Sequence, residues 1–193
     1  KIHPDTLDEG DHTFTLAATN TGGASGTGTA TIDDRGNGVK FPDVAPTSPA
    51  SLDPTPGSDA TDLDDDRPLT VNNIRVNEGS PYAVFTVTGK EGQKVKLSLA
   101  GGSATIENGA APIATDGSED FGPTLQYWNG SAWTDYTANS FISMPDDIDG
   151  TAGEVAKLLV RTQIHPDTLD EGDHTFTLAA TNTGGASGTG TAT

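Results

Sequence analysis

Hydrophobic and polar residues alternate in several short segments of this chain, and that alternation predicts β-strands. In residues 82–89 (YAVFTVTG), Ala83, Phe85 and Val87 fall on one face of the expected strand. Residues 94–100 (KVKLSLA) alternate between aliphatic side chains and lysine or serine in the same way. Further strands are expected at residues 156–162, 174–181 and 188–193.

An aromatic segment at residues 125–136 (LQYWNGSAWTDY) contains two aromatic runs separated by Asn129-Gly130, a strong turn signal. We interpret its aromatic side chains as core and hairpin packing, with a carbohydrate-stacking platform as the alternative; they are Tyr127, Trp128, Trp133 and Tyr136. About seven short strands, polar turns and no convincing helix predict an all-β fold, an antiparallel β-sandwich over residues 69–193.

One segment occurs twice. Residues Ile2–Thr31 are repeated without a mismatch at Ile164–Thr193, an offset of 164 − 2 = 162 residues. A period of this size indicates repeated domains rather than a solenoid. We therefore expect a window from a longer tandem array, in which residues 1–31 are the C-terminal strands of a preceding repeat. Since a lone hairpin is marginally stable in water, it needs the rest of its own unit or strands from another molecule.

The composition of residues 32–68 differs from that of the rest of the chain. This segment holds six of the 12 prolines and nine aspartates. Proline favours an extended conformation and like charges repel one another, so we interpret the segment as a linker.

The net charge of −18 argues against nucleic acid or an anionic membrane surface as a partner. No stretch approaches the roughly 18 apolar residues of a membrane span, so we expect no membrane insertion. The absence of cysteine excludes disulfides and thiolate metal sites.

Several motifs together resemble Calx-beta-like (Ig-like) repeats, in particular the arrays of giant adhesins that Gram-negative bacteria export by type I secretion. The motifs are VNEGSPYAVFTV (76–87), EDFGP (119–123), DTLDEGDHTFTLAATNTGGASGTGTATIDD (5–34) and DLDDDRP (62–68). The resemblance implies a Greek-key β-sandwich, calcium bound at one end of the domain, and an extracellular location on a bacterial cell surface.

The same resemblance supplies candidate calcium ligands: Glu78, Asp120, Asp167, Glu171 and Asp173, with Asp33 and Asp34 as the terminal pair of the preceding unit. Calcium takes 6–8 oxygen ligands, and loops at one pole of a sandwich can bring distant carboxylates together. The chain departs from the family where Pro166 precedes Asp167 and where His174 replaces a common acid. Because neutral histidine is a poor calcium ligand, one usual site is expected to be altered.

A second candidate calcium site lies just before the first strand of the domain, at Asp62, Asp64, Asp65 and Asp66. Adjacent carboxylates there are suited to calcium and would stiffen the joint between linker and domain. The alternative is a solvated acidic linker, which is what a charge run usually is.

Enzyme activity is not expected. The four histidines are two positions counted twice, and neither a nucleophile elbow nor an HExxH helix is present. A zinc site formed by His165 and His174 is a minor alternative.

We expect a structural extender of an extracellular adhesin or fibre, rigidified by calcium, with neighbouring copies of the repeat as partners. Strand complementation between units is a further option, and an adhesion module that binds a glycan or protein is the alternative function.

Overall fold

The computed structural model describes residues 2–3, 5–36, 38, 63–107, 119–146, 154–166 and 172–193. The chain divides into unit 1, residues 1–66 with 183–185, and unit 2, residues 67–182 with 186–193. The described residues form antiparallel strands and no helix, which confirms the all-β prediction. None of them belongs to a helix long and apolar enough to cross a membrane. Residues 39–62 of the predicted linker, Asp167 and Glu171 lie outside the described residues.

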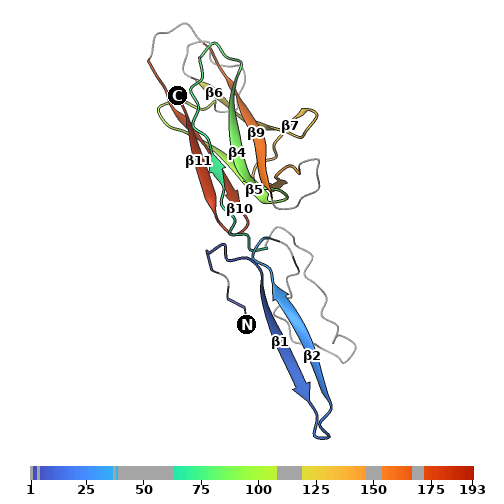
Figure 1. The fold of residues 1–193 in the computed structure, drawn as a ribbon. Coiled ribbons are helices and arrows are strands. Elements are labelled where there is room, and N and C mark those ends of the chain that lie inside the picture. Colours follow the sequence, from blue (N-terminus) through green and yellow to red (C-terminus); the bar gives the residue numbers. More distant parts are fainter. Residues whose placement is uncertain are drawn as a thin grey trace. The chain divides into compact units, whose positions relative to one another are not determined.

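Unit 1 contains the hairpin of β1 (His12–Thr19) and β2 (Ser25–Ile32), drawn in blue in Figure 1. Its turn is closed locally, because the Asn20 amide donates to the Ala24 carbonyl at 3.0 Å. The Asn20 side-chain oxygen also accepts the amides of Gly22 and Ala24, at 2.9 and 3.0 Å. The two strands expected at this end of the chain are therefore present.

In its described residues unit 2 has nine strands in two sheets (Figure 1). One sheet has the order β11 (Ser187–Ala192), β10 (Phe176–Asn182), β5 (Lys94–Gly101), β8 (Ile142–Ser143). The other has the order β3 (Thr70–Val71), β4 (Tyr82–Lys90), β9 (Val155–Ile164), β6 (Phe121–Trp128), β7 (Trp133–Asp135). All pairings between these strands are antiparallel.

The inward faces of the two sheets share one apolar core, an arrangement consistent with the predicted β-sandwich. Ala83, Phe85 and Val87 of β4 are fully buried, as their alternation with polar residues predicted. The centre of the core is aromatic: Phe176 stacks on Phe121 with ring centroids 4.3 Å apart and meets Phe85 edge-on at 5.8 Å. Offset and edge-to-face ring pairs of this kind add about 0.5–1.5 kcal/mol beyond area burial.

The predicted aromatic hairpin is formed by β6 and β7, with Trp128 opposite Trp133. The turn between them depends on Asn129, whose side-chain oxygen accepts the amides of Ser131 and Ala132. Gly130 takes a φ of +95°, a conformation that glycine adopts without a steric penalty. The sequence signal for this turn is thus confirmed.

Candidate functional site

Three of the predicted calcium ligands line one open pocket of about 610 Å³ in unit 2: Glu78, Asp120 and Asp173. They come from three separate segments, which precede β4, precede β6 and precede β10. The antiparallel pairing brings these loops to one pole, as expected from the sequence. The same wall carries basic and titratable side chains, namely Arg75, His165 and His174.

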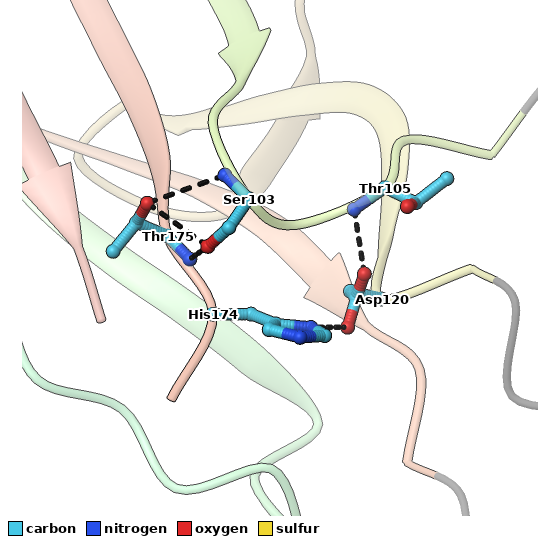
Figure 2. A network of polar contacts seen from close by, with 5 residues as sticks. All are labelled: Ser103, Thr105, Asp120, His174 and Thr175. Carbon is cyan, nitrogen blue, oxygen red and sulfur yellow. Dashed lines mark hydrogen bonds and ion pairs between the residues drawn. The ribbon is translucent and has the colours of Figure 1, made fainter. Parts of the chain in front are cut away.

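The carboxylate of Asp120 contacts two other segments at this pole (Figure 2). One carboxylate oxygen lies 2.8 Å from Nδ1 of His174, and the other accepts the Thr105 amide at 2.5 Å. Beside it, the Thr175 amide donates to the Ser103 hydroxyl at 2.8 Å, so the segments before β6, after β5 and before β10 are tied together. Both oxygens of Asp120 are therefore used in holding loops.

The other ionisable groups of the pole are paired or buried. Asp173 forms an ion pair with Arg75 at 2.8 Å, and both side chains are largely exposed. His165 is 5% exposed, and its Nε2 lies 3.7 Å from a carboxylate oxygen of Glu107. Nδ1 of His165 is buried and has no hydrogen-bond partner among the described residues. Asp120, Asp173 and Glu107 thus already lie beside basic side chains.

A second group of carboxylates lies in unit 1, and we call it the aspartate cluster: Asp5, Asp34, Asp64, Asp65 and Asp66. Two short pairings bring its segments together. Arg35 forms an isolated antiparallel bridge with Asp65, and a carboxylate oxygen of Asp34 accepts the Glu9 amide at 2.9 Å. Asp33 forms a local hydrogen bond instead: its carboxylate accepts the amide of Arg35, two residues later, at 2.8 Å.

Two carboxyls of the aspartate cluster, those of Asp64 and Asp66, have pKa values raised above the ordinary value. Burial raises the pKa of Asp64, and the charges of Asp34, Asp5 and Asp65 raise it further. Burial likewise raises the pKa of Asp66, with Asp64 as the largest charged contributor. Asp66 is only 8% exposed, and its Oδ2 is buried without a hydrogen bond from the described part of the chain. A carboxylate in that state is stabilised by a nearby cation.

The structure thus separates the predicted calcium ligands into two groups, one in each unit. Asp34 joins Asp64–Asp66 in unit 1, whereas Glu78, Asp120 and Asp173 lie at the pole of unit 2. Asp5 was not predicted, although it is the repeat copy of the predicted ligand Asp167 and the offset of 162 residues would have found it. Arg75, Glu107 and the Asp120–His174 pair gave no recognisable sequence signal.

Oxygen donors of this kind fit calcium chemically, since the ion prefers clustered carboxylates. The fit is not a preformed cage: among the described residues, no three His, Cys, Asp or Glu side chains gather closely enough to hold a metal ion. The same holds for the zinc alternative at His165 and His174. Calcium would therefore have to draw the carboxylates of the aspartate cluster closer together.

Comparison of the chain with models of protein families, with curated proteins and with solved structures finds no match. The likeness to Calx-beta-like repeats therefore rests on the sequence motifs alone.

Proposed function

We propose that this chain is a structural extender from a tandem array in an extracellular adhesin or fibre, built from Greek-key β-sandwich repeats of the Calx-beta type. The observation that carries the proposal is the exact repetition of Ile2–Thr31 at Ile164–Thr193. The second copy supplies β10 and β11, and Phe176 and Leu178 of that copy are part of the core of unit 2. The repeated segment is therefore an integral part of a folded domain, and a domain-sized repeat suits a role in length and stiffness.

Calcium enters the proposal through the aspartate cluster. Raised pKa values of Asp64 and Asp66 mean that these groups resist ionisation, so a divalent cation bound there would relieve repulsion that otherwise works against order. The buried Oδ2 of Asp66 offers an oxygen without a hydrogen-bond partner among the described residues. Asp34 and Asp5 would complete the set. At the pole of unit 2, by contrast, Arg75 and His174 already lie against Asp173 and Asp120.

The stabilisation follows from linkage. An ion that binds only the ordered state adds RT ln(1 + [L]/Kd), which is about 2.7 kcal/mol at a hundredfold excess over Kd. An extender in a calcium-rich medium would be stiff, and the same extender in chelator would loosen at the segments that carry the aspartates.

Calorimetric titration of the chain with calcium tests this proposal. We expect heat of binding that is abolished in the variant Asp64→Asn/Asp66→Asn and retained in Asp146→Asn, which neutralises one exposed carboxylate outside the cluster. Magnesium serves as the ion control because it dehydrates reluctantly and demands tighter geometry. Absence of binding by the unmodified chain would refute the calcium part of the proposal.

The alternative, an adhesion module for a glycan or protein, is favoured by one feature. Trp128 is 36% exposed at the edge of a shallow hollow of about 350 Å³, which Tyr127 and Phe141 also line. Exposed aromatic faces suit stacking on sugar rings or apolar side chains. A glycan array probed with the chain and with Trp128→Ala tests the glycan form of this alternative. Binding that needs Trp128 supports the adhesion module, and no binding by either protein counts against a glycan ligand.

A further inference from the structure

The two copies of the repeated segment form the same hairpin. In unit 1 Phe14 pairs with Ala30, and at the matching positions of unit 2 Phe176 pairs with Ala192. The same amide-to-carbonyl hydrogen bond closes both turns, at 3.0 and 2.9 Å. The hairpin geometry is therefore independent of what surrounds it.

The surroundings of the two copies differ completely. Phe176 is 4% exposed and Leu178 is fully buried, whereas their copies Phe14 and Leu16 are 52% and 72% exposed. Every residue of β1 is exposed. Two large apolar side chains on one face of a bare hairpin therefore have no cover among the described residues of unit 1.

Unit 2 shows what covers this sequence. β10 pairs with β5 from Phe176 to Asn182, so one edge of the hairpin is occupied along its length. On the other edge, the amides of Ile74 and Val76 donate to carbonyls of the β11 end at 2.9 Å each. The described residues of the segment 67–164 thus form a framework that holds both edges and the apolar face of the hairpin. By contrast, neither edge of β1–β2 is paired to a further strand in the described part of unit 1.

The glycines of the repeated segment also indicate that the hairpin is suited to close contact with another backbone. A Cβ at Gly190 would collide with the Asn72 carbonyl, and one at Gly188 would lie 2.7 Å from the Thr70 backbone. Their copies, Gly28 and Gly26, have no described atom within 4 Å of such a Cβ. Glycine weakens a strand unless another backbone must approach closely. In β11 the close approach is present, and β2 carries the same glycines without it.

We propose that the face of β1–β2 bearing Phe14 and Leu16 is a docking surface for a second copy of residues 67–164, held as β10–β11 is held in unit 2. The inference rests on the proposed role in an array and names the partner that such a unit joins. Because both hairpins have one sequence, exchange of one for the other preserves every contact of the framework. The β10–β11 hairpin is the next element after β9 in the same chain and therefore has the higher effective concentration, so it fills the framework of its own chain first.

The experiment compares four full-length chains: the unmodified protein, an N variant (Phe14→Ala/Leu16→Ala), a C variant (Phe176→Ala/Leu178→Ala) and an NC variant with all four changes. Thermal melts are recorded over a hundredfold range of protein concentration, and masses are measured by light scattering. We expect the N variant to melt like the unmodified chain, since its altered side chains are exposed. The C variant should keep a cooperative transition about 10 °C or more above that of the NC variant, because β1–β2 replaces the damaged hairpin.

Docking on a second copy makes two further results necessary. The melting midpoint of the C variant should rise with protein concentration, and its mass should be at least twice that of the NC variant. Coinciding melts of the C and NC variants would overturn the proposal, and this includes the case in which both are unfolded. If the C variant melts above the NC variant but is a monomer, and its melting midpoint does not depend on protein concentration, the partner is not a second copy of the chain.

All four chains are compared at one calcium concentration. A missing response to calcium, which would count against the proposed extender, therefore leaves the difference between the C and NC variants unaffected.

Discussion

Replacement of Asp120 by alanine tests whether this residue holds neighbouring loops together or binds calcium. Its carboxylate accepts the Thr105 amide at 2.5 Å and lies 2.8 Å from His174, and the side chain is 23% exposed. Hydrogen bonds to charged groups contribute about 1.5–3 kcal/mol each. Partial exposure reduces that value, so we expect Asp120→Ala to lower the free energy of unfolding of unit 2 by about 2–4 kcal/mol.

The matched control is Asp173→Ala, which removes the same charge from the same pocket wall. Asp173 is paired with the exposed Arg75, and exposed ion pairs contribute about 0–1 kcal/mol. Thermal and urea unfolding of both variants, in chelator and in calcium, measures the difference. For a domain of this size the Asp120 variant should melt about 6–15 °C lower, and the control within about 3 °C of the unmodified chain.

Two results would refute this reasoning. Equal shifts in the two variants would mean that the Asp120 hydrogen bonds contribute nothing beyond their charge. A loss confined to calcium would identify Asp120 as a ligand rather than a clamp.

Further outcomes are expected for the aspartate cluster, Arg161 and Thr162. The pKa values of Asp64 and Asp66 are raised above 3.8, so these two carboxyls bind protons more tightly in the ordered state than in the unfolded chain. Stability therefore falls as pH rises from about 3.8 through the raised values. Carboxyl NMR titration of Asp64 and Asp66 should give midpoints above 3.8 that calcium lowers. Arg161→Ala removes a guanidinium that lies 3.8 Å from the Tyr82 ring centroid and 4.2 Å from that of Trp133, and should cost about 1–2 kcal/mol in urea unfolding and shift tryptophan emission. Because stacking on two rings requires the planar guanidinium, Arg161→Lys should lose most of the same stability, and full retention of stability in that variant would contradict the stacking argument. Thr162→Val removes the buried hydroxyl that donates to the Gly122 carbonyl at 2.7 Å beside the irregular pairing of β6 and β9, and should cost about 1–3 kcal/mol; an unchanged urea midpoint would count against that.

Much of the local structure could be read from the sequence. The alternation in residues 82–89 predicted β4 and its buried face, and Asn129-Gly130 predicted the turn between β6 and β7. Both signals are local, because side chains of a strand alternate between faces and a positive φ favours glycine.

The candidate site was predictable only in part. Carboxylates at strand ends were expected to converge, and Glu78, Asp120 and Asp173 do line one pocket. Their partners were not predictable, since Thr105 and His174 reach Asp120 from distant segments of the chain. The raised pKa of Asp66 depends on its burial, which no charge pattern reports.

The repeated segment separates the contribution of sequence from that of tertiary structure. Its sequence alone determined a hairpin with one register and one turn, because the hydrogen bonds that define them join residues close in the chain. Whether the phenylalanine and leucine of that hairpin are buried was decided only by tertiary structure: Phe176 and Leu178 are covered by residues 67–164, and Phe14 and Leu16 are exposed. Burial depends on which other surface is present, and identical sequences can therefore differ in it entirely.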